Sequence, residues 1–192
     1  MGIESKIWPL NEVFYIESLL SITRTILSEK QVANTFLDEY RAGDIKNQKL
    51  LLDSVQNIVC QAALLSKYFW PVRKNAIHRN RGERLREAYL ITDSNCLKSR
   101  VVRDYIEHFD EKLDNYLSTF IFGSVMPLYL GPRIYSQGKH IFRGYFTDEA
   151  VFTILGIEFS MIPIVEEVER LHFMLEEDVT TGRIRFNPIL GK

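Results

Sequence analysis

Between residues 11 and 122, apolar side chains recur every three or four positions, and this period limits the segment to amphipathic helices. The pattern is strongest over residues 45–69, where a wide apolar stripe predicts a central helix. Trp70-Pro71 ends this helix, because the residue before a proline avoids helical backbone angles. The same spacing predicts further helices over residues 11–28, 29–41 and 96–122, and a short helix that begins near Arg81.

After Gly123 the pattern changes, because five of the ten glycines lie between residues 123 and 156. Strands are predicted over residues 140–146 and 151–157 with a turn at 147–150, followed by a helix from Ser160 to about Glu177 and a short strand over 183–186. A lone hairpin is marginally stable in water, so this part must pack on the helices. We therefore expect a mainly helical chain: a bundle of about five helices over residues 1–122, and a C-terminal β-hairpin and helix over residues 123–192, together one structural domain.

The composition indicates an ordinary globular protein that stays where it was made. Of the 192 residues, 46% are hydrophobic and 26% are charged. No apolar run approaches the roughly 20 residues needed to cross a bilayer, and the first ten residues do not resemble a signal peptide. Two cysteines, Cys60 and Cys96, are too few for a disulfide framework. The expected location is the cytoplasm, with no membrane association.

Several classes of enzyme are disfavoured by what the sequence lacks. The four histidines are far apart, and none has a second ligand at metal-binding spacing. The chain has neither a phosphate-binding glycine loop nor a dinucleotide-binding fingerprint. Gly123-Ser124-Val125 lacks the second glycine of a serine hydrolase nucleophile elbow. We therefore expect no metal site and no cofactor.

The net charge is only −1, but the charges are unevenly distributed. Nine Lys or Arg residues and three Asp or Glu residues lie between Arg73 and Arg103, whereas residues 104–118 contain five acids and one base. Such a basic surface can guide a polyanion locally. The alternative is an ordinary solvated face.

The most informative stretch is Arg103-Asp104-Tyr105-Ile106-Glu107-His108, within the helix predicted over residues 96–122. A histidine can move a proton at a 2′-hydroxyl or a 5′-oxygen, and an arginine can hold a phosphate, with no metal required. Asp104 lies four residues before His108 and can hydrogen-bond its ring. On an ideal helix Arg103 and His108 point about 140° apart, so two facing copies would bring them together more naturally. From spacing alone, the simpler alternative is a helix face solvated by ion pairs.

This stretch resembles the motif of the HEPN superfamily, in which an arginine and a polar residue precede a histidine. Here Arg103 is followed by Asp104, in place of the commoner asparagine, and then by His108. The wider segment Arg100 to Asp114, and Arg81-Gly82-Glu83-Arg84-Leu85-Arg86, resemble a group of uncharacterised bacterial proteins. The resemblance covers about residues 11–122. The C-terminal hairpin and helix are not part of the superfamily core.

The resemblance implies a HEPN-like helical bundle that forms homodimers and cleaves RNA without metal, as in toxins and abortive-infection proteins. His108 would then be the general acid/base, Arg103 would hold the scissile phosphate and Asp104 would orient His108. The backbone of the RNA would be bound by Arg79, Arg81, Arg84 and Arg100. An antitoxin protein is a further implied partner.

Two alternatives remain open at this stage, because some members of the superfamily have no demonstrated catalysis. One is a non-catalytic helical module that binds a nucleotide or a partner protein through Tyr105 and Tyr116. The other is a structural dimer in which the motif is merely solvated.

Overall fold

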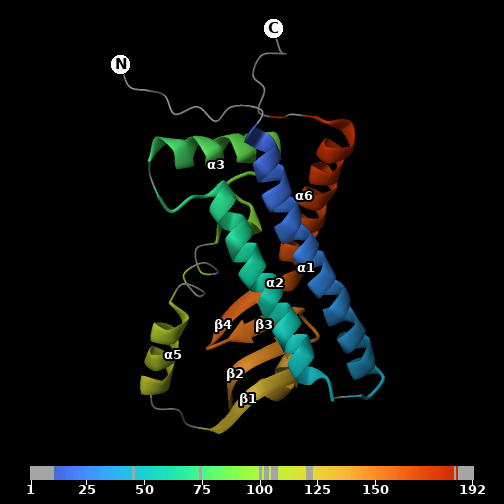
Figure 1. The fold of residues 1–192 in the computed structure, drawn as a ribbon. Coiled ribbons are helices and arrows are strands. Elements are labelled where there is room, and N and C mark those ends of the chain that lie inside the picture. The colour runs from blue at the N-terminus through green and yellow to red at the C-terminus, as the bar shows by residue number, and fades with distance from the viewer. Residues whose placement is uncertain are drawn as a thin grey trace.

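The computed structural model describes residues 11–44, 46–73, 75–99, 101, 104, 108–119, 123–183 and 185. The chain is mostly helical with a small four-stranded sheet and a C-terminal helix, which confirms the expectation of a mainly helical chain (Figure 1). In chain order the elements are α1 (Glu12–Arg41), α2 (Gln48–Phe69), α3 (Ala76–Ala88), η2 (Cys96–Lys98), α5 (Phe109–Ser118), β1 (Ser124–Gly131), η3 (Arg133–Ser136), β2 (Lys139–Phe146), β3 (Val151–Ile154), β4 (Ile157–Ser160) and α6 (Met161–Thr181).

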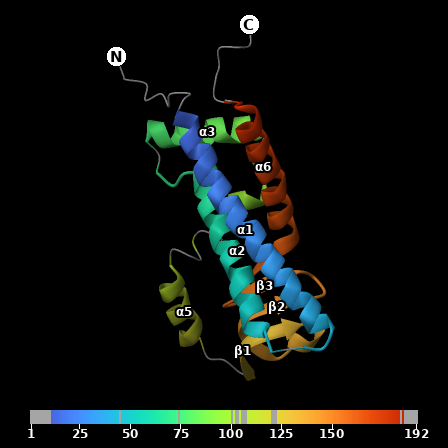
Figure 2. The same cartoon turned by 45° about the vertical axis from the view of Figure 1, so that its right-hand side comes forward.

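Three long helices, α1, α2 and α6, lie side by side and form the body of the molecule (Figures 1 and 2). Helix α1 runs antiparallel to the other two, and it contacts both of them. Their facing stripes supply side chains with no exposed surface, including Leu19 and Leu20 of α1, Leu65 of α2, and Val168 and Leu171 of α6. Full burial of such a side chain contributes about 1.5–3 kcal/mol, so this seam is the main source of stability.

The sheet packs against one end of the helices and shares their core. Its order is β1-β2-β3-β4, with β1 parallel to β2 and the other pairs antiparallel. Strand β3 is buried throughout, and Phe152 and Ile154 belong to the same apolar cluster as the helix residues. Helix α2 contacts both β1 and β2. The sheet therefore depends on α2 for burial of its inner face.

Two predicted N-terminal helices are a single helix, α1. The boundary expected between residues 28 and 29 is wrong, because the segment contains neither glycine nor proline to interrupt the hydrogen bonding. Helix α2 agrees with the predicted central helix, although it begins at Gln48 rather than at residue 45. Helix α3 begins five residues before Arg81, because the Asn75 side chain accepts a hydrogen bond from the His78 amide and caps its first turn.

The long helix predicted over residues 96–122 is wrong. After η2 the backbone turns extended at Ser99 (ψ 121°), and His108 is also non-helical (φ −129°, ψ 36°), so α5 starts at Phe109. None of the α5 residues is buried. A helix draws most of its stability from burial of one face, and the apolar residues Phe109, Leu113 and Tyr116 of α5 are only partly buried. Residues 100, 102–103, 105–107 and 120–122 lie outside the described residues.

The C-terminal part contains more strands than the sequence pattern indicated. Residues 151–157 form two strands rather than one, because Leu155 and Gly156 both have positive φ (50° and 76°) and make a tight hairpin turn. Strand β1 was not predicted. It contains Pro127, which an edge strand tolerates. Neither Arg183 nor Arg185 is in a strand, and the other two residues of the strand predicted over 183–186 lie outside the described residues.

The last predicted helix is present as α6, which continues to Thr181 and ends at Gly182 in the left-handed conformation (φ 66°). Across the described ranges, no helix is long and apolar enough to pass through a membrane.

A buried ionic cluster joins the ends of the long helices. The Asp178 carboxylate of α6 is buried and accepts hydrogen bonds from the Arg185 guanidinium (2.6 and 2.8 Å) and the Tyr89 hydroxyl (3.1 Å). The backbone amide of Arg185 donates to the buried Glu12 carboxylate of α1 (3.0 Å). The hydrogen bond to Asp178 raises the pKa of the Arg185 guanidinium, although burial opposes this. The cluster ties α1, α3 and α6 together at one end.

Replacement of Arg185 should therefore destabilise the fold. In Arg185→Ala the Asp178 carboxylate stays buried without its cationic partner, which should lower the free energy of unfolding by about 3 kcal/mol. Urea denaturation of both proteins measures this loss. Arg183→Ala removes a nearby exposed guanidinium and should change the value by less than about 0.5 kcal/mol. Equal stability of the two variants would show that the cluster does not hold the chain end.

Gly82 is buried where α3 crosses the end of α2. A Cβ at this position would lie 2.7 Å from the Phe69 carbonyl oxygen and 2.7 Å from Pro71 Cδ. Glycine therefore permits the close approach of the two helices, which alanine would prevent.

We expect Gly82→Ala to destabilise the protein, against the usual trend. In a helix with free space, this change is favourable by about 1 kcal/mol. Here the clash should make the substitution unfavourable. The free energy of unfolding should fall by about 1–3 kcal/mol, as measured by thermal or urea unfolding. Glu83→Ala, at the exposed neighbouring position of α3, is the control and should be close to neutral. A stabilised Gly82→Ala variant would contradict this packing.

Candidate functional site

His108 lies immediately before α5, at the periphery of the molecule. Figures 1 and 2 both show α5 outside the body formed by α1, α2 and α6. The Phe109 ring packs edge-on against Phe142 of β2, with 6.4 Å between the ring centroids, and Leu113 and Tyr116 are partly buried against the core. These contacts hold α5 to the sheet and leave the His108 side chain 55% exposed.

Among the described residues, the charged group beside His108 is Glu111, which the sequence analysis did not select. Nδ1 of His108 lies 3.6 Å from Oε1 of Glu111. The amide of His108 donates a hydrogen bond to the backbone carbonyl of Asp104 (3.3 Å), and Asp104 is itself exposed. An accessible imidazole beside a carboxylate can take up and release a proton. The spacing of three residues in the sequence was the signal that could have identified Glu111.

The arginines predicted to act with His108 fall outside the described residues. These are Arg103, the expected phosphate-binding group, and Arg100, an expected RNA contact. Tyr105, expected to contact a ligand in the non-catalytic alternative, is also outside them. Its companion Tyr116 is partly buried against the core.

The other predicted RNA contacts lie on α3, which crosses the end of the helical body opposite the sheet (Figure 1). Arg79 is exposed and Arg84 is half-buried. Arg81 is partly occupied by the fold, because its Nη2 donates to the Lys67 carbonyl of α2 (3.0 Å) and its guanidinium lies 5.5 Å from the Tyr68 ring centroid. Arg81 thus donates a hydrogen bond to one of the last carbonyls of α2, which have no amide partner within that helix.

Arg86, which was not selected, has a similar position. It donates to the Phe69 carbonyl and lies 5.9 Å from the Trp70 ring centroid. Arg81 and Arg86 are separated by about one and a half helical turns and together fasten α3 to the end of α2. The sequence predicted that the basic residues of this region form one surface. Two of them, Arg81 and Arg86, have a structural role in the contact between α3 and α2.

An open pocket of about 500 Å³ lies where α1, α2 and α3 meet. It is lined by Asn11, Phe14, Tyr15, Ser18, Lys67, Tyr68 and Arg81. Apart from Arg81, none of these residues was selected from the sequence. The position of Phe14 was a possible sequence signal for an exposed aromatic ring, because it is out of phase with Ile16, Leu19 and Leu20, which are buried. In the structure Phe14 is 70% exposed. The other lining residues are adjacent only in the folded chain.

A second histidine, His172 on α6, has a hydroxyl and a carboxylate nearby. Its Nδ1 lies 2.9 Å from Thr23 Oγ1 of α1, and its Nε2 lies 3.7 Å from Glu176. Thr23 has no exposed surface, and its hydroxyl also donates to the Leu20 carbonyl (3.1 Å). A buried hydroxyl cannot reach a substrate, so this group joins α1 to α6 and is not a catalytic triad.

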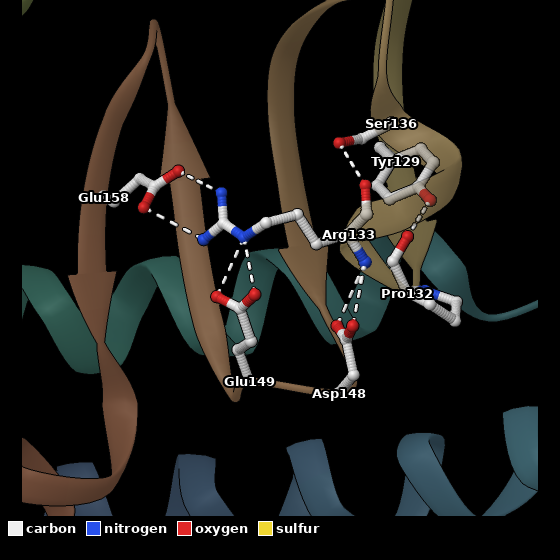
Figure 3. Close-up of polar contacts among 7 residues, drawn as sticks. All are labelled: Tyr129, Pro132, Arg133, Ser136, Asp148, Glu149 and Glu158. Carbon is white, nitrogen blue, oxygen red and sulfur yellow. Dashed lines mark hydrogen bonds and ion pairs between the residues drawn. The ribbon is translucent and has the colours of Figure 1, made fainter.

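A cluster of polar contacts surrounds Arg133 of η3 (Figure 3). Its guanidinium donates to Glu149 (2.8 Å to each oxygen) and Glu158 (2.6 and 3.0 Å), and its amide donates to Asp148 (3.0 and 3.2 Å). Hydrogen bonds to Glu158 and Glu149 raise the pKa of the Arg133 guanidinium. The head group also lies 4.1 Å from the Phe146 ring centroid. Because the guanidinium is shared by two carboxylates, we interpret this cluster as a clamp between η3, the β2–β3 turn and β4.

Within the part of the chain that the structure describes, no group of three or more His, Cys, Asp or Glu side chains could hold a metal ion. No protein-family model matches the chain, and neither a curated protein nor a solved structure matches it. The resemblance of the Arg103–His108 stretch to the HEPN superfamily therefore remains an expectation from the sequence.

Proposed function

We propose that the protein is a metal-independent endoribonuclease in which His108 acts as the general acid/base. The observation that carries the proposal is the exposed imidazole of His108 with the Glu111 carboxylate 3.6 Å from Nδ1. The Glu111 carboxylate lies on the Nδ1 side of the ring. Nε2 is then the nitrogen that exchanges a proton with the substrate.

The remaining roles follow the motif of the superfamily that the sequence resembles. Arg103 holds the scissile phosphate and stabilises the charge that develops on it. Asp104, exposed one turn before His108, supports the imidazole together with Glu111. The chain acts as a homodimer, in which the motifs of two copies face each other across one RNA. A toxin or abortive-infection role, with an antitoxin as a partner, fits this activity.

Arg79 and Arg84 on α3 supply contacts to the RNA backbone, together with Arg100 and, in part, Arg81. Helix α3 lies at one end of α2, and α5 lies beside the other half of α2 (Figures 1 and 2). An RNA that reaches both elements therefore follows the length of α2. Binding through these arginines weakens as the salt concentration rises, because each neutralised phosphate releases counterions.

The test is RNA cleavage by the purified protein in the presence of a chelator. His108→Ala should reduce the cleavage rate at least about 100-fold, and Glu111→Gln should reduce it about tenfold. His78→Ala is the matched control, because His78 lies on α3 away from α5, and it should retain the parent rate. Cleavage that persists in His108→Ala would remove this mechanism.

Expression in living cells provides a second measurement of the same proposal. Growth arrest should appear with the parent protein and disappear with His108→Ala at equal protein levels. Arrest by both proteins would show that any toxicity is independent of the imidazole.

A second candidate function is a non-catalytic binding module. The observation that favours it is the pocket between α1, α2 and α3, which is formed by the stable body of the protein. In this case the purified protein turns over no RNA, and His108→Ala has no effect on ligand binding.

A further inference from the structure

The pocket at the junction of α1, α2 and α3 has the dimensions of a small-molecule site. Its volume of about 500 Å³ falls within the range of roughly 300–1,000 Å³ that is usual for ligand pockets. All three contributing helices are anchored: α1 and α2 by the main core, and α3 by the hydrogen bonds of Arg81 and Arg86 to α2 carbonyls. The site is therefore largely formed before any ligand arrives.

Three aromatic rings contribute to the lining: Phe14, Tyr15 and Tyr68. Phe14 is 70% exposed even though it is among the largest apolar side chains of α1. A flat ligand that stacks on this ring removes apolar surface from water on both partners, which is favourable. Tyr68 is held by the guanidinium of Arg81, 5.5 Å from its ring centroid.

Two of the described lining residues are charged, and both are cations. They are Lys67 and Arg81, and none of the described lining residues carries a carboxylate. The Arg81 guanidinium has a defined position, because its Nη2 donates to the Lys67 carbonyl (3.0 Å). Two positive charges beside aromatic rings favour an anionic group over a cationic or neutral one. The amide of Asn11 and the hydroxyl of Ser18 add polar contacts.

We propose that this pocket binds a small molecule in which a flat aromatic ring carries an anionic group. The ring stacks on Phe14, and the anion pairs with Lys67 and Arg81. This chemistry is shared by nucleoside monophosphates, which carry a phosphate, and by aromatic carboxylates. The site uses neither His108 nor Glu111, so it does not depend on RNA cleavage, and it names a ligand class for the binding-module alternative.

The test is calorimetric titration of the full chain with five probes: adenosine monophosphate, indole-3-acetate, inorganic phosphate, adenosine and indole. At least one of the two compounds that combine a ring with an anion should bind saturably at or below about 1 mM. Inorganic phosphate, and the matching neutral ring compound, should bind at least about tenfold more weakly. Preference for the monophosphate assigns the anion as phosphate, and preference for indole-3-acetate assigns it as carboxylate.

Variants connect the binding to the pocket. Phe14→Ala should weaken it about tenfold, because the variant removes the ring on which the ligand stacks. Lys67→Gln should weaken it by a similar factor and reduce its sensitivity to salt. Phe173→Ala is the matched control, since Phe173 is 73% exposed on α6 and lies outside the pocket lining. It should bind as the parent does.

Three results would overturn the proposal. The first is that neither adenosine monophosphate nor indole-3-acetate binds saturably. The second is that Phe14→Ala binds the probe as tightly as the parent does. The third is that inorganic phosphate binds as tightly as the monophosphate. His108→Ala should keep full binding of the probe. If His108→Ala loses RNA cleavage and still binds the probe, the two proposed sites are independent. Either proposal can then fail without the other.

Discussion

Burial of the facing stripes of α1, α2 and α6 is the constraint on which the rest of the structure depends. The stripe of α6 comes from a part of the chain more than a hundred residues beyond α1, yet Val168 and Leu171 are as completely buried as Leu19 and Leu20. This seam also decides the place of the sheet, because Phe152 of β3 enters the same core. The elements with candidate functions are attached to this body and contribute little to it.

The two ends of the body are secured by different interactions. At the end where α3 lies, buried polar groups join three helices through Asp178, Tyr89 and Arg185, and Gly82 lets α3 lie close against the end of α2. At the sheet end, Arg133 clamps a loop, a turn and an edge strand with solvent-accessible ion pairs. Buried charges are costly when one partner is lost, whereas exposed pairs contribute little, so the first end has more to lose from a substitution.

The two proposed sites differ in how firmly they are held. The pocket is built on three anchored helices, which suits recognition of a ligand with a defined shape. His108 precedes a short helix that contains no buried residue, and it is held to the sheet mainly by Phe109 and its neighbours. The proposed catalysis at His108 and the proposed ligand binding in the pocket can therefore be tested separately by substitution.

Periodicity in the sequence by itself determined the elements whose burial pattern is local: the central helix α2, the strand β2, and the last helix α6. The sequence and its resemblance to a known motif also selected His108, Asp104 and Arg81 as candidate site residues, and their roles stay predictions. Tertiary structure decided the rest. Interruption of the predicted helix at Ser99 and His108 depends on which neighbours are present to cover it, and the edge strand β1 depends on pairing with β2. Likewise, the pocket exists only because three helices bring Phe14, Tyr68 and Arg81 together. A periodic pattern records which face of an element is apolar, but not which distant element covers it.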